Sequence, residues 1–245
     1  MKILNSILMI CLLIPALTSQ AQEHQKKKKP KRTDNFIRME GLRLGTDITR
    51  PFQSLWNKGD RYGGEVTADF ELYPNFFPVA EAGWEKLKVD QEYVRYNSSG
   101  PYFRFGANYN ILAATSRTDK DLLYIGFRYG ISFASQAVDY YKIDNYWDEE
   151  TGSFPSQNYN SQWFELVFGM KGEVLKNFYL GWSIRAKFNL FQKEYDLPGI
   201  YFNPGFGNAE NSSNADITYS ISYNIPFRIK RHKNAVVPQP EGKRK

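Results

Sequence analysis

The sequence predicts an all-β protein, an eight-stranded antiparallel up-and-down transmembrane β-barrel with short periplasmic turns and long surface loops. Aromatic residues make up 16% of the 245 residues, and aromatic side chains pack well on a pleated sheet. Apolar and polar residues alternate with a period of two along much of the chain, as they do in strands. No apolar run is long enough for a spanning helix, whereas a transmembrane strand needs an apolar residue only at every second position.

Eight segments carry this alternation, with apolar residues on one face and polar residues on the other. In one of them, Leu180, Trp182 and Ile184 alternate with Gly181 and Ser183. Several segments are about as long as a tilted strand that crosses a membrane, roughly 9–11 residues. The predicted strands are 42–49, 65–72, 80–85, 102–111, 123–133, 164–171, 178–190 and 217–227, of which 80–85 has the weakest pattern.

The connections between these segments alternate in length. Short connections are expected near 73–76, 114–120 and 175–177, and long ones at 50–62, 86–101, 135–162 and 191–215. Outer-membrane barrels show this pattern, with short periplasmic turns and longer surface loops. The pattern thus predicts an outer-membrane location, and an even number of strands puts both termini on the side of the short turns, the periplasm.

The two ends of the chain differ from the body. Lys2, the apolar stretch 7–17 and Ser19-Gln20-Ala21 have the order of a cleaved signal peptide, which predicts cleavage after Ala21. A buried helix and a lipoprotein acylated at Cys11 are alternatives. The predicted organisation is a signal peptide at 1–21, a basic periplasmic linker at 22–38, the barrel at 39–229 and a basic periplasmic tail at 230–245.

The formal charge of +6 raises the question of a nucleic-acid partner. The excess of lysine and arginine lies in 22–38 and 228–245, while 39–227 carries more acidic than basic residues. A basic face on the folded domain is therefore not expected, and neither is a nucleic-acid partner.

Alternation alone does not say which face points inward, because a lipocalin-like soluble barrel would bury the apolar face. Glycines such as Gly106, Gly126 and Gly130 on the polar face favour a crowded polar interior, and aromatics at strand ends resemble the girdles of membrane barrels. An eight-stranded barrel is about filled by its own side chains. We therefore expect ion pairs that block the lumen, formed among Arg43, Asp47, Glu65, Asp69, Glu71, Glu81, Glu85, Arg104, Arg128, Glu165, Lys171, Arg185 and Lys187.

Catalytic and metal-binding patterns are scarce. The histidines, His24 and His232, lie in the terminal segments, so no histidine-based catalytic or metal site is expected in the barrel. Carboxylate pairs such as Glu81 and Glu85 are expected to partner arginines. We therefore predict no enzyme, no cofactor and no firm metal site, with one weak cation candidate at Asp144, Asp148 and Glu149.

The predicted surface loops have an adhesive composition. Candidate partner-binding residues are Tyr140, Tyr141, Tyr146 and Trp147 in one loop, because such aromatics anchor protein interfaces. Tyr195, Tyr201, Phe202 and Phe206 give the loop 192–214 a similar character. The tails add Lys26, Lys27, Lys28, Lys29 and Arg231 as candidate partner-binding residues.

With this signal, these strands and the final strand Tyr219–Phe227, the chain resembles the small outer-membrane barrels of Bacteroidota, the PorT-like group and related uncharacterised families. The resemblance implies an accessory or structural subunit of a larger envelope complex, for outer-membrane protein assembly or secretion. Its expected partners are outer-membrane lipid and other outer-membrane or periplasmic proteins. A small channel or transport protein, a barrel enzyme and a soluble ligand-binding barrel are the alternatives.

Overall fold

The computed structural model describes residues 41–51, 60–73, 75–112, 121–144, 149–192 and 198–226. The predicted signal peptide and both basic tails lie outside these residues. The long strands are β1 (Gly41–Asp47), β2 (Arg61–Phe70), β3 (Phe76–Asp90), β4 (Val94–Asn110), β5 (Leu122–Asp144), β6 (Glu149–Leu175), β7 (Phe178–Gln192) and β10 (Ser213–Pro226). Two short strands, β8 (Phe202–Asn203) and β9 (Gly207–Asn208), form a separate hairpin. None of the helices in the described segments has the length and apolar character needed to span a membrane.

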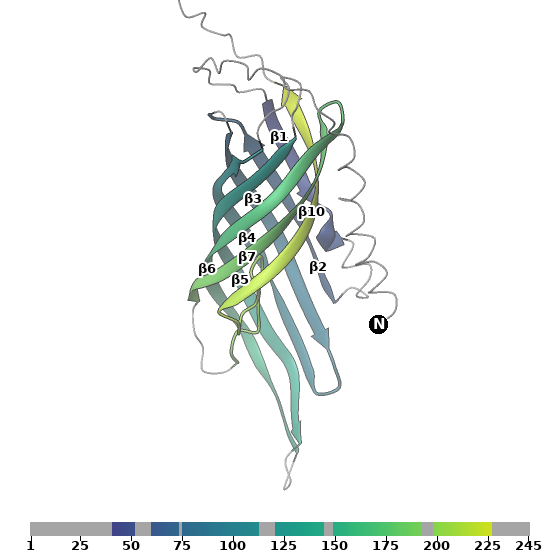
Figure 1. Cartoon of the computed structure of the whole chain (residues 1–245). Helices are drawn as coiled ribbons and strands as arrows, with labels where there is room; N and C mark the ends of the chain where they lie inside the picture. Colours follow the sequence, from purple (N-terminus) through teal and green to yellow (C-terminus); the bar gives the residue numbers. More distant parts are fainter. Residues whose placement is uncertain are drawn as a thin grey trace, which may run out of the picture. The chain divides into compact units, whose positions relative to one another are not determined.

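The eight long strands form one closed antiparallel ring in the order β1-β10-β7-β6-β5-β4-β3-β2 (Figure 1). Each long strand pairs with its neighbour along the chain, and β1 closes the ring by pairing with β10 from Gly41↔Pro226 to Asp47↔Ser220. The small β8–β9 hairpin lies within the connection from β7 to β10 and pairs with no strand of the ring. The predicted all-β class with eight antiparallel strands in up-and-down order is thus confirmed.

The ring has two unlike ends. At what we call the turn end lie the connections β2–β3, β4–β5 and β6–β7, together with the start of β1 and the end of β10. Asn75 and Asn177 have a φ of 66° in two of these turns, a conformation that asparagine tolerates better than most residues. The opposite end, which we call the hairpin end, carries the other connections, and there the β5–β6 hairpin extends furthest (Figure 1).

The predicted long loops at 86–101 and 135–162 are wrong. These residues are mostly strand: β3 and β4 pair out to Asp90↔Arg95, and β5 and β6 pair out to Asp144↔Glu149. The outward positions there lose their apolar character while the backbone pairing continues, so alternation of hydrophobicity stops marking the strand. Tyr96 and Val138 still point inward and form a small core with Phe202.

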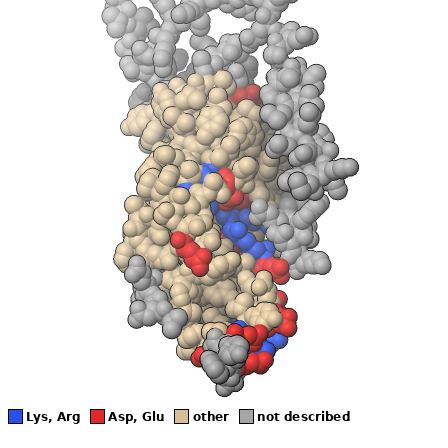
Figure 2. Space-filling model, turned by 60° about the horizontal axis from the view of Figure 1, so that its bottom comes forward, with Lys and Arg blue, Asp and Glu red and all other residues tan. Residues whose placement is uncertain are grey.

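The two faces of the ring are inverted relative to a soluble barrel. Charged residues are buried inside: Arg43, Asp47, Glu65, Asp69, Glu81, Glu85, Arg104, Arg128, Glu165, Lys171, Arg185 and Lys187. Large apolar residues are exposed outside: Leu44, Val66, Trp84, Phe105, Ile125, Phe127, Leu166, Phe168, Leu180, Ile184, Ile217 and Tyr219. Figure 2 shows charged side chains in the mouth of the ring and at the hairpin tips, with most of the visible wall uncharged.

Candidate functional site

The middle of the ring is crossed by a central cluster of three arginines and three glutamates, namely Arg104, Arg128, Arg185, Glu65, Glu81 and Glu165. Arg104 contacts all three carboxylates, pairing with Glu65 and lying 3.2 Å from oxygens of both Glu81 and Glu165. Arg185 reaches Glu81 across the ring, with 2.7 Å between Nη1 and Oε2. Because each charge has partners of the opposite sign, the cluster fills the ring without leaving an isolated buried charge.

A second, smaller cluster lies toward the turn end. Asp69 accepts hydrogen bonds from Arg43 Nε at 2.6 Å and from Lys171 Nζ at 2.5 Å. The guanidinium of Arg43 also lies over the rings of Phe77 and Tyr179, at 4.8 and 5.5 Å from their centroids. Such cation–π contacts compensate a cation for lost water. The turn-end cluster therefore forms a second charged barrier.

The third cluster lies toward the hairpin end. Glu85 pairs with Arg50 and with Arg61, whose Nε lies 2.6 Å from Oε1. Lys187 lies 3.2 Å from Asp216. The helical turn at 49–51 carries Arg50 into the interior, where its Nε lies 3.6 Å from an oxygen of Asp47.

A small cavity with a volume of about 20 Å³ lies between the central and turn-end clusters. Hydroxyls and charged groups line it, among them Thr67, Lys171, Ser183 and Thr218. A water molecule needs about 10–15 Å³ by this measure, so the cavity has room for about one. The interior described here is thus packed with side chains and does not form a wide channel.

The segment 198–209 folds into the ring from the hairpin end, which corrects the prediction of a surface loop. Phe202 and Phe206 are buried, whereas Tyr201 is exposed; Tyr195 lies outside the described residues. Phe206 packs on Trp163 with 5.9 Å between the ring centroids. Ser132 donates a hydrogen bond of 2.5 Å to Asn203 Oδ1. We call residues 198–209 the inserted loop.

Two fully buried aromatics, Tyr102 and Trp163, separate the inserted loop from the central cluster. Their polar groups point down to that cluster: the Tyr102 hydroxyl donates to Glu65 and Trp163 Nε1–H donates to Glu165, both at 2.7 Å. Each ring lies across an inward glycine of the neighbouring strand. A Cβ at Gly83 would fall 2.3 Å from Tyr102, and one at Gly130 would fall 2.2 Å from Trp163.

We predict that Gly130→Ala destabilises the ring markedly. The new methyl group would collide with the Trp163 indole, which is rigid and enclosed, and such overpacking typically costs about 1–3 kcal/mol. Gly64→Ala is the matched control, because a Cβ at Gly64 meets nothing within 4 Å. Urea unfolding in detergent micelles would measure both variants, and equal stability of the two would contradict this role of Gly130.

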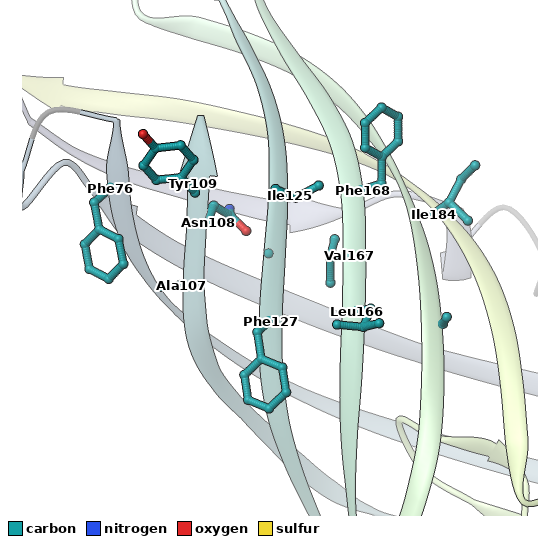
Figure 3. A pocket seen from close by; sticks show the side chains of 12 residues that line it. Phe76, Ala107, Asn108, Tyr109, Ile125, Phe127, Leu166, Val167, Phe168 and Ile184 are labelled. Atoms are coloured by element: carbon teal, nitrogen blue, oxygen red, sulfur yellow. The ribbon is translucent and has the colours of Figure 1, made fainter. Parts of the chain in front are cut away.

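The outer wall has an apolar hollow of about 650 Å³ across β4 to β7 (Figure 3). Ala107, Gly126 and Ala186 are small residues of its lining, and larger apolar side chains such as Phe127 and Phe168 stand beside them. The lining carries no charged residue. The hollow therefore belongs to the apolar outer face and adds no polar site.

Most of the residues predicted as interior ion pairs meet in the three clusters, including acids of β1–β3 and bases of β4–β7 that are far apart in sequence. Glu71 lies instead at the turn end, where it accepts the N–H of Asn75 at 3.1 Å. Sequence reasoning missed Arg50, Arg61 and Asp216. Asp216 continues the inward alternation by one further step and Arg61 by two, a signal that was present, whereas Arg50 has no periodic signal.

The predicted partner-binding residues of the β5–β6 hairpin are partly engaged within the protein. Tyr141 stacks on Phe154 with 5.2 Å between ring centroids, and Tyr140 lies 5.8 Å from the Arg95 guanidinium. Tyr141 therefore helps to hold the hairpin together. Tyr146, Trp147, Lys26, Lys27, Lys28, Lys29 and Arg231 lie outside the described residues.

The weak cation candidate is not assembled in the described part of the chain. Asp144 and Glu149 both contact Lys142 Nζ, at 3.3 and 2.9 Å, and their hydrogen bonds raise the pKa of Lys142 above its ordinary range. Asp148 lies outside the described residues. Among those described, no group of three or more His, Cys, Asp or Glu side chains could hold a metal ion.

These features define a class: a closed antiparallel ring with an apolar outer face and an interior crossed by three layers of ion pairs. The chain belongs to a family of domains of unknown function, DUF6048, whose match covers residues 1–230. No curated protein matches the sequence.

Proposed function

We propose that this protein is an outer-membrane β-barrel with a sealed lumen that acts as a non-enzymatic accessory or structural subunit of a larger envelope complex. The inverted ring is the observation that carries the proposal. Exposed residues such as Phe127, Leu166 and Ile184 on a closed ring suit lipid, while Arg104 and Glu81 are buried within. A soluble barrel would place its apolar face inside.

The packed interior supports a structural role over transport. Three charged layers and two enclosed aromatics lie inside the described part of the ring, and the small cavity between the central and turn-end clusters has room for about one water molecule. With the lumen blocked, the surfaces left for function are the outer wall, the hairpin tips and the basic tails. These are the surfaces through which a subunit would hold other outer-membrane or periplasmic proteins.

The proposed topology places the turn end and both termini in the periplasm and the hairpin end outside the cell. It can be tested with single cysteines, since the sequence has one native cysteine, Cys11, within the predicted signal. A membrane-impermeant maleimide should label Asp144→Cys on intact cells, and Lys176→Cys only after the outer membrane is permeabilised. Labelling of Lys176→Cys on intact cells, or recovery of the protein in the soluble periplasm, would refute this topology.

Two measurements separate the accessory role from the alternative of a small channel. Purified protein in planar bilayers should give no steady conductance, and purification in mild detergent should recover a stoichiometric envelope partner. A stable open conductance would favour the channel. Recovery of the protein alone, after crosslinking in cells, would count against the accessory role.

A further inference from the structure

We propose that the hairpin end of the ring is a closed-bottom cup that binds a turn-forming, aromatic-containing peptide segment of another protein in place of its own inserted loop, which folds as the β8–β9 hairpin. This site is additional to the structural role proposed above and does not depend on the membrane location.

The cup recognises the inserted loop largely through its backbone. Lys187 Nζ donates to the carbonyl oxygen of Gly205 at 2.8 Å, while Glu85 accepts the N–H of the same residue at 2.9 Å. A lysine and a glutamate thus hold two sides of one residue's backbone. Gly205 has a φ of +81°, which glycine adopts readily.

Further backbone contacts line the way into the cup. The Tyr159 hydroxyl donates to the carbonyl oxygen of Phe202. Gln136 Nε2 donates to the carbonyl oxygen of Pro198 at 3.2 Å. Backbone contacts do not depend on side-chain identity, so they fit another peptide that makes the same turn with glycine at the position of Gly205, where a Cβ would fall 2.7 Å from Tyr102.

Selectivity would come from the aromatic floor. The Phe206 side chain is almost fully buried between Trp163 and Tyr102, in one cluster of enclosed rings. The guanidinium of Arg61 lies over the Phe202 ring, 5.0 Å from its centroid. A ligand would therefore need an aromatic residue at the position of Phe206, and a second aromatic at that of Phe202 would strengthen binding.

The inserted loop can leave without opening the ring. The seam beside it is closed by direct pairing of β7 and β10, from Ser213↔Phe188 to Tyr223↔Phe178. Below the floor, the central cluster keeps its own ion pairs. Withdrawal of the loop would consequently expose a cup with an aromatic floor and charged walls, closed toward the turn end.

The test uses a synthetic peptide with the sequence of residues 198–209, labelled with a fluorophore, and the full chain in detergent. In one variant, residues 198–209 are replaced by a glycine-serine linker of equal length. We expect saturable binding of the peptide to this variant by fluorescence anisotropy. A peptide with Phe206→Ala should bind about tenfold more weakly or worse, because it no longer buries an aromatic ring.

Equal binding of the two peptides would overturn the proposal. So would the absence of binding to a linker variant that still shows the gel mobility of the folded protein without heating. If the linker variant does not fold, Phe206→Ala in the full chain provides the test. Both proteins compared in this test carry phenylalanine in place of the other four tryptophans. Acrylamide should quench the fluorescence of Trp163 more strongly in the protein with Phe206→Ala than in the protein that keeps Phe206. Unchanged quenching would refute the cup.

Discussion

Replacing Arg104 by methionine is expected to destabilise the ring by about 3–5 kcal/mol, the typical loss when one partner of a buried ion pair is removed. Arg104 is fully buried and contacts Glu65, Glu81 and Glu165. Methionine fills part of the same space, so the loss would come mainly from three carboxylates left facing two arginines. Unfolding by urea in micelles or vesicles would measure the change.

Two further variants separate charge from packing. Arg95 lies on the same strand, but its side chain is 62% exposed and pairs with Asp90 at 3.2 Å, so Arg95→Met should change stability by under about 1 kcal/mol. Adding Glu165→Gln to Arg104→Met removes the surplus negative charge and should restore part of the stability. A double variant no more stable than Arg104→Met would show that packing, not charge, is what Arg104 provides.

The strands of the ring were predictable because period-two alternation marks them, and the polar inward face was predictable from the glycines that this face carries, since alternation alone does not say which face points inward. In 123–133 and 178–190 the alternation is strong, and both stretches lie within strands of the ring, β5 and β7. The strand ends were not predictable in the same way. Beyond Phe133 most of the outward residues are polar, and hydrophobic alternation cannot distinguish a strand in water from a loop.

The ion-pair clusters were predictable in membership but not in pairing. Asp69 and Lys171 are 102 positions apart in sequence, and only the closure of the ring brings them to bonding distance. Arg50 was missed because it reaches the interior from a helical turn, not from a strand. No spacing rule connects a residue in such a turn to a cluster formed by strands.

The inserted loop was the largest error, and its cause is chemical. Glycine, proline, asparagine and aromatic residues make up most of 198–209, a composition that serves an exposed loop and a buried one equally well. The one distinguishing signal was charge, since this stretch has no Asp, Glu, Lys or Arg although charged residues flank it on both sides. A loop without charges can enter the ring without bringing an unpaired ion.

The second large effect concerns the outer wall, where Ile125→Arg is expected to cost about 1–3 kcal/mol and to impair membrane insertion. Ile125 is 51% exposed on β5, inside the apolar band that we propose to face lipid. Arginine on the lipid face of a transmembrane barrel costs most at the middle of the bilayer and less toward its edges, whereas the same change on a surface facing water is close to neutral.

Ile143→Arg is the matched control for this prediction. Ile143 lies on the same strand and is 48% exposed, but it sits near the tip of the β5–β6 hairpin, beyond the apolar band. Folding into phospholipid vesicles, followed by gel mobility without heating, should show a deficit for Ile125→Arg and none for Ile143→Arg. Equal folding of the two variants would remove the case for lipid at this wall, because the two sites match in residue, strand and exposure and differ in distance from the hairpin tip.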